Sequence, residues 1–110
     1  MITTHVLDTA AGRPGKAIAI ELERADGAAW LPVGAGTTDD DGRLRTLTQS
    51  GSVTAGVYRL RFHTGAYFAA HGRDGFFPVV EIQFSVIDGA QHYHVPLLLS
   101  PYGYSTYRGS

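Results

Sequence analysis

Apolar and polar residues alternate with a period of two along three stretches of the chain. In residues 16–23, Ile18, Ile20 and Leu22 share one face, and glutamates occupy the other. The same alternation runs through residues 56–63 and 79–86. It is typical of strands that turn one face toward a core and the other toward water or a partner. The pattern therefore predicts three strands, each with one buried face.

Turn-forming sequences punctuate the chain from AAGRPG near its start to SPYG near its end. They recur about every eight to twelve residues, a rhythm typical of an all-β sandwich or barrel. Only residues 65–71, GAYFAAH, predict a short helix. We therefore expect one all-β domain over residues 1–110, with about eight short strands in two packed sheets.

The stretch HYHVPLLL, residues 92–99, departs from simple alternation because both of its faces carry apolar groups. Pro96 cannot donate a hydrogen bond to a neighbouring strand, so we expect it at a bulge or an unpaired position. A strand covered on both faces of so small a sandwich predicts contact with another subunit. The following YSTYRGS also alternates and predicts a final strand.

Charge and composition exclude several classes of partner. The net charge is −1, with 9 basic and 10 acidic residues and no basic cluster, which argues against nucleic acid. Lys16 is the only lysine, so no polybasic patch for a membrane is present. The absence of cysteine excludes disulfides, thiol catalysis and thiolate metal sites. Without a secretory signal in MITTHVLD or a long apolar run, we expect a cytoplasmic protein.

Histidine is the natural candidate for a general base, because its ordinary pKa lies near neutrality. The chain has five: His5, His63, His71, His92 and His94. We interpret His63 and His71 as surface residues or as core residues whose hydrogen bonds are satisfied. His92 and His94 share a strand face, and with His5 they could form a three-histidine zinc site. No acidic neighbour supports that alternative, so we favour a site without metal.

Two arginines follow an acidic turn in TTDDDGRLR. Arg43 and Arg45 share a face if a strand begins there, and either could hold a planar polar substrate or stabilise an oxyanion. Pairing of Arg43 with an aspartate of residues 39–41 is the alternative that the sequence alone favours. No GxSxG motif supports a nucleophilic serine.

Three segments, THVLDTAAGRPG, TDDDGR and HYHVPLLLSPYGYSTYRGS, identify a family. Through them the sequence resembles the 5-hydroxyisourate hydrolases, the transthyretin-related proteins of purine breakdown. The resemblance covers essentially the whole chain, and YRGS at the C-terminus is its most specific part. It implies a transthyretin-like β-sandwich of two four-stranded sheets with one short helix. It also implies a homotetramer whose active sites lie where two dimers meet.

The resemblance also implies the reaction and its residues. Its catalytic residues fall on His5, Arg43 and His94, and its substrate-binding wall falls on Tyr107, Arg108, Gly109 and Ser110. The implied reaction hydrolyses a ring amide of 5-hydroxyisourate and opens the six-membered ring to a ureidoimidazoline carboxylate, with no cofactor. We expect His94 to be the general base, with His5 assisting and Arg43 stabilising the oxyanion. A transthyretin-like carrier of thyroid hormone, the zinc hydrolase described above and a purely structural sandwich are the alternatives.

Overall fold

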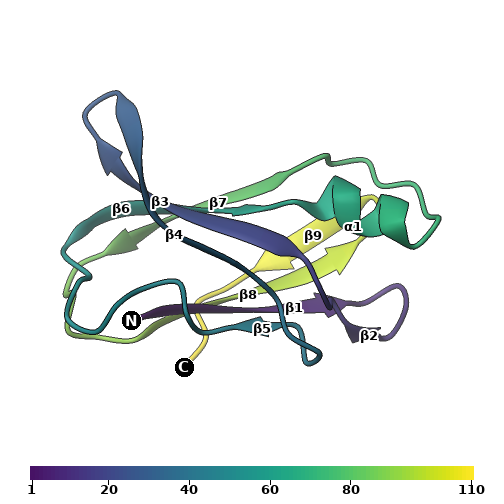
Figure 1. Ribbon diagram of the computed structural model, residues 1–110, viewed down its shortest axis with the longest axis horizontal. Coiled ribbons are helices and arrows are strands. Elements are labelled where there is room, and N and C mark those ends of the chain that lie inside the picture. The colour runs from purple at the N-terminus through teal and green to yellow at the C-terminus, as the bar shows by residue number, and fades with distance from the viewer.

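The computed structural model describes residues 1–110 and consists of two β-sheets packed face to face (Figure 1). The first sheet contains β1 (Ile2–Asp8), β2 (Arg13–Pro14), β5 (Arg43–Leu44), β8 (Tyr93–Ser100) and β9 (Gly103–Thr106). The second contains β3 (Ala19–Asp26), β4 (Ala29–Thr37), β6 (Gly56–Phe62) and β7 (Val80–Val86). The only helix, α1, spans Thr64–Ala70. The predicted all-β sandwich with one short helix is confirmed.

The first sheet is four strands wide although it contains five strands. Both β2 and β5 lie on the free edge of β1, where Leu7 and Asp8 pair with β2 while Thr4 and His5 pair with β5. On its other edge β1 pairs with β8, and this is the only parallel pairing in the molecule. Two strands from opposite ends of the chain thus lie side by side at the centre of the sheet.

The core forms between the inward faces of the two sheets. Period-two alternation in β3 and β6 places every second side chain there, as predicted for residues 16–23 and 56–63. The core cluster comprises 19 buried residues: Ile2, Val6, Ile18, Ile20, Leu22, Leu44, Leu47, Val53, Tyr58, Leu60, Phe62, Tyr67, Phe68, Val80, Val86, Tyr93, Val95, Leu97 and Leu99.

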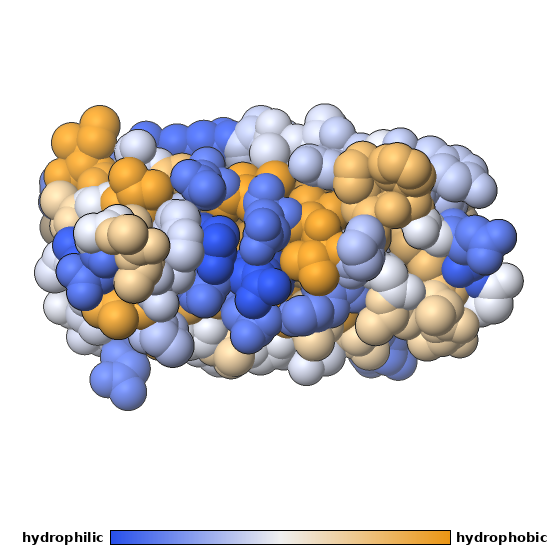
Figure 2. All heavy atoms as spheres, turned by 90° about the horizontal axis from the view of Figure 1, so that it is seen from above, coloured by the Kyte–Doolittle hydropathy of each residue, from blue (hydrophilic) through white to orange (hydrophobic).

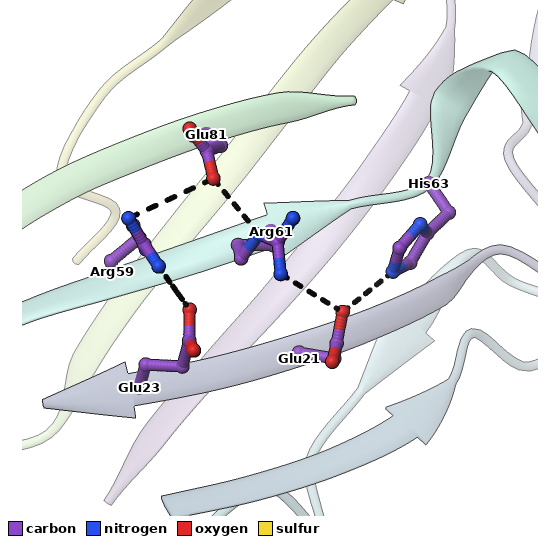
Figure 3. Close-up of polar contacts among 6 residues, drawn as sticks. All are labelled: Glu21, Glu23, Arg59, Arg61, His63 and Glu81. Carbon is purple, nitrogen blue, oxygen red and sulfur yellow. Dashed lines mark hydrogen bonds and ion pairs between the residues drawn. The ribbon is translucent and has the colours of Figure 1, made fainter. Parts of the chain in front are cut away.

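The outer face of the second sheet is occupied by paired charges (Figure 3). Arg61 lies between Glu21 and Glu81, while Arg59 donates two hydrogen bonds to Glu23. His63 Nε2 lies 2.6 Å from a carboxylate oxygen of Glu21, in keeping with its interpretation as a surface residue. Seen from above, hydrophilic residues gather near the middle of this face among apolar ones (Figure 2). Its charges satisfy one another and leave no free ionic group for a substrate.

A buried carboxylate joins the end of β1 to the helix region. Asp8 is 1% exposed and accepts hydrogen bonds from the Tyr67 hydroxyl at 2.7 Å and from Arg73 at 2.6 Å. Burial alone would raise the pKa of Asp8, but these bonds and the backbone N–H of Ala11 outweigh it and lower the pKa to about 2. This cluster anchors β1 and therefore the strand that carries His5.

The only helix, α1, is not long and apolar enough to cross a membrane.

Pro96 interrupts the pairing between β8 and β9, as expected for a residue without an N–H. The regular pairing ends at Leu97 and Thr106, and it resumes as an isolated bridge between His94 and Gly109. The Thr106 hydroxyl donates to the Pro96 carbonyl at 2.7 Å across this gap. Pro96 is therefore unpaired on its β9 side, as predicted, although on its other side it lies within β8 and pairs with His5 of β1. The chain beyond the gap returns to the sheet next to His94.

Candidate functional site

A tight turn brings Arg43 against β1. Gly42 has φ of +78°, and a Cβ at this position would lie 2.3 Å from the carbonyl oxygen of Val6, so only glycine fits. The Val6 N–H donates to the Gly42 carbonyl at 2.8 Å and holds the turn in place. Arg43 then pairs directly with His5 across β5 and β1. The first two residues implied as catalytic are therefore immediate neighbours.

In the acidic turn before Arg43, backbone N–H groups bond to the Asp39 carboxylate, and the guanidinium of Arg43 does not. Asp39 accepts hydrogen bonds from the N–H groups of Asp41 and Arg43, each at 2.9 Å. These bonds, with that of Arg43 first, lower the pKa of Asp39. Lys16 pairs with Asp40, whereas Arg43 and Arg45 form no salt bridge. The pairing of Arg43 with an aspartate, favoured on the sequence alone, is wrong, and the guanidinium is free to bind a ligand.

The parallel pairing of β1 with β8 places Thr3 beside His94. The Thr3 hydroxyl oxygen lies 2.7 Å from His94 Nδ1 and 2.7 Å from His92 Nε2. In the next row of the same face, His5 lies opposite Pro96. Because residues at i and i+2 of a strand share a face, Thr3, His5, His92 and His94 all lie on the outer side of the first sheet.

The ring of His5 is held by the turn that carries Arg43. Its Nε2 lies 2.8 Å from the carbonyl oxygen of Asp41. Since a carbonyl oxygen only accepts hydrogen bonds, Nε2 carries the proton in this contact. The neutral ring then keeps its lone pair on Nδ1, which is available to a water molecule or a substrate N–H.

The C-terminal residues complete this face beside His94. The Gly109 N–H donates to the His94 carbonyl at 2.7 Å. A Cβ on Gly109 would lie 2.6 Å from Cδ2 of the His94 ring, so the ring packs directly on the glycine backbone. Figure 1 shows the two chain ends close together at this end of the first sheet, and Ser110 lines the resulting pocket.

The pocket is lined mostly by polar residues and has a volume of about 220 Å³. Its lining includes Thr3, Arg43, Arg45, His92, His94 and Ser110. Ligand sites usually measure ~300–1,000 Å³, so this hollow is smaller than most of them. His5 is one row away from this lining, beside Arg43.

The surroundings of His94 favour its neutral form. Burial is the largest cause that lowers the pKa of His94, because it disfavours the charged ring. The positive charge of Arg43 lowers it further, followed by those of His92, His5 and Arg45. A neutral histidine beside two free guanidiniums combines a base with groups that can hold oxygens or stabilise an oxyanion.

The C-terminal residues predicted to bind substrate line two separate hollows. Gly109 and Ser110 lie at His94, as described above. In the single chain, Tyr107 and Arg108 line a neighbouring groove of about 170 Å³ between β7 and the end of β9. Arg108 lies 4.5 Å above the Tyr93 ring and donates to Gln91 at 3.0 Å.

The histidines do not form the metal site considered as an alternative. No group of three or more His, Cys, Asp or Glu side chains is arranged to hold a metal ion. The arrangement does not fit a three-histidine zinc centre with an open fourth position.

Two parts of the pocket were not assigned to the site from the sequence. Thr3 was missed, although its alternation with His5 indicated a shared face. Arg45 was considered with Arg43 as an arginine that could hold a substrate, but only Arg43 was assigned to the site. The missing information is the pairing of β1 with β8, which joins residues 91 positions apart in the chain.

Comparisons with known proteins show the family to which the chain belongs. The family model described as "HIUase/Transthyretin family" matches residues 2–109. A 5-hydroxyisourate hydrolase of Rhizobium meliloti is 46% identical over 114 residues, covering 99% of this chain and 95% of that protein. The solved 5-hydroxyisourate hydrolase of Klebsiella pneumoniae is 35% identical, with a TM-score of 0.85 and coverage of 99% and 98%. Sea bream transthyretin, solved in complex with thyroxine, is 32% identical, with a TM-score of 0.92 and coverage of 98% and 93%. The chain therefore belongs to the HIUase/Transthyretin family.

Proposed function

We propose that this protein is a 5-hydroxyisourate hydrolase that opens the six-membered ring of its substrate. The observation that carries the proposal is the gathering of His5, Arg43 and His94 on one sheet face beside the C-terminal Ser110. The relatives named 5-hydroxyisourate hydrolase, similar over nearly the full chain, support the same activity.

The reaction begins with attack of water on a carbonyl of the ring amide. His94 takes a proton from that water through Nε2, the ring nitrogen not engaged by Thr3. Arg43 binds the carbonyl oxygen and stabilises the negative charge that develops on it. The C–N bond then breaks, and the leaving nitrogen receives the proton that His94 took from water. His5 lies next to Arg43 and orients the water or assists that nitrogen.

The complete site is proposed to form in a homotetramer, where two dimers meet on the outer face of the first sheet. The small volume of the pocket in one chain supports this assembly, because a second chain would deepen it. Leu98 is half-buried on the same face, so its exposed part can supply an apolar contact. Tyr107 and Arg108 are proposed to wall the site in that assembly, and mass measurement under native conditions tests the tetramer.

A carrier of thyroid-hormone-like ligands is the second candidate, and the fold similarity to sea bream transthyretin supports it. Such a carrier has no chemical need for two histidines and an unpaired arginine on one face. Hydrolysis accounts for all three groups, which is why we favour it.

The test is the decay of 5-hydroxyisourate generated in place from urate, followed by absorbance with and without the protein. We expect faster decay and a product with one enantiomer in excess, whereas spontaneous hydrolysis gives a racemate. Activity should persist after chelation, since no cofactor takes part in the proposed reaction. Decay at the spontaneous rate with a racemic product, together with thyroxine binding, would favour the carrier. Fractionation of the source cells tests the expected cytoplasmic location.

A further inference from the structure

Thr3 links the two histidines of β8 through one hydroxyl group. Its oxygen lies 2.7 Å from both His92 Nε2 and His94 Nδ1, and the residue is 3% exposed. A hydroxyl carries one proton to donate and has two lone pairs that accept. The Thr3 hydroxyl is buried and has no partner besides the two rings, so its proton goes to one ring and the other ring donates to it. The protonation states of the two rings are therefore coupled through Thr3.

Two arrangements of protons satisfy this geometry. In the first, His92 donates to Thr3 and Thr3 donates to His94 Nδ1, which leaves the proton of neutral His94 on Nε2. In the second, His94 Nδ1 donates to Thr3 and Thr3 donates to His92 Nε2. Only the second leaves a lone pair on His94 Nε2, the nitrogen available to the pocket. A general base that acts through Nε2 needs the second arrangement.

We propose that Thr3 is a positioning residue that holds His94 as its Nδ1–H form by accepting that proton and donating its own to His92. The inference rests on the proposed function, because the geometry alone allows both arrangements. It also assigns a role to His92, whose ring is the exposed end of the chain of hydrogen bonds.

The same bonds let the positive charge move away from the pocket during the reaction. When water loses a proton to His94 Nε2, the ring becomes an imidazolium. Its Nδ1 proton passes to the Thr3 oxygen while the hydroxyl proton of Thr3 passes to His92 Nε2, which places the positive charge on the exposed His92. When the proton on His94 Nε2 passes to the leaving nitrogen, Thr3 returns a proton to His94 Nδ1 and His92 Nε2 returns one to Thr3. The starting arrangement is then restored, and the proton taken from water is on the leaving nitrogen.

The Thr3→Val variant tests the role directly, because it keeps the branched shape of the side chain and removes the hydroxyl. We expect kcat to fall about tenfold to a hundredfold, at most the lower limit of the ~10²–10⁴-fold that general-base action contributes, because His94 itself remains. KM should change little, and Thr3→Ser should recover most of kcat because serine restores the hydroxyl. Thr9→Val is the matched control, since the Thr9 hydroxyl also bonds to β8, at the Leu99 carbonyl, away from the histidines.

A measurement without substrate separates this inference from the proposed function. Nitrogen-15 NMR of the histidine rings at neutral pH should show His94 protonated on Nδ1 in the wild type. In His92→Gln, whose substitution is at an exposed position and should not impair folding, the Nδ1–H form should be partly lost. Wild-type His94 protonated on Nε2 would overturn the proposal even if the protein is an active hydrolase. Full kcat in Thr3→Val would overturn it as well.

Discussion

Replacing Gly109 with alanine would press a methyl group against the ring of His94. The added Cβ would lie 2.6 Å from Cδ2, while carbon atoms in contact are normally about 3.5–4.0 Å apart. The ring must therefore move by about 1 Å, because the backbone of Gly109 is held by its hydrogen bond to the His94 carbonyl. Cδ2 is bonded to Nε2, so the shift displaces the nitrogen that we propose as the base.

The size of the effect follows from this displacement. A misplacement of ~1 Å in catalytic geometry can cost about a hundredfold in rate, which corresponds to about 3 kcal/mol in the activation free energy. We expect Gly109→Ala to lower kcat by about that factor in the 5-hydroxyisourate decay assay. Thermal unfolding should change little, because Gly109 lies outside the core cluster.

Gly103→Ala provides the matched control for this experiment. Its Cβ would meet only the Ser100 side-chain oxygen, at 3.7 Å, which is an ordinary contact. Both variants exchange glycine for alanine, so they change the entropy of the unfolded chain in the same way. If Gly109→Ala turned over substrate as fast as Gly103→Ala while keeping its assembly state, the argument from the position of His94 would be refuted.

Three further predictions concern the chain terminus, the buried carboxylate and the pH profile. Deleting Tyr107–Ser110 should reduce turnover at least about a hundredfold with little loss of stability, and wild-type activity of the truncated chain would contradict the proposed wall. Asp8→Asn should lower the free energy of unfolding by about 2 kcal/mol at pH 7, because the pKa of Asp8 falls from 3.8 to about 2 on folding. The stabilisation by the ionised carboxylate is complete above pH ~4 and disappears as pH falls through about 2. Urea unfolding at pH 7 and at pH ~2 checks this, and an equal loss of unfolding free energy at the two pH values would contradict it. Arg45→Gln removes a charge that lowers the pKa of His94, so the acidic limb of kcat against pH should move to higher pH; an unchanged limb would exclude that influence.

Local patterns predicted the strands well because one period-two signal reports one buried face. The alternation of Ile18, Ile20 and Leu22 was enough to identify the inner side of β3. The helix was expected at residues 65–71 and is found at Thr64–Ala70. Pro96 was expected at an unpaired position for the simple reason that it lacks an N–H. Each of these features depends on residues close together in the chain.

The site depended on pairings that local patterns do not contain. The contact between Thr3 and His94 exists because β1 and β8 pair in parallel, at a register that no segment of the chain specifies alone. The aspartates before Arg43 suggested an ion pair, but Asp39 is used by backbone N–H groups of its own turn. Acidic residues of a turn often bond to nearby backbone in this way, which makes side-chain pairing hard to predict from proximity in sequence.

The most direct test of the account compares His94→Gln with wild type in the decay of freshly generated 5-hydroxyisourate. His71→Gln is the matched control, because it exchanges the same side chains at an exposed position beyond α1. We predict that His94→Gln slows the catalysed decay by about 10²–10⁴-fold, the range of general-base action, while His71→Gln keeps the wild-type rate. A folded His94→Gln protein that hydrolyses the substrate as fast as wild type would contradict the central claim.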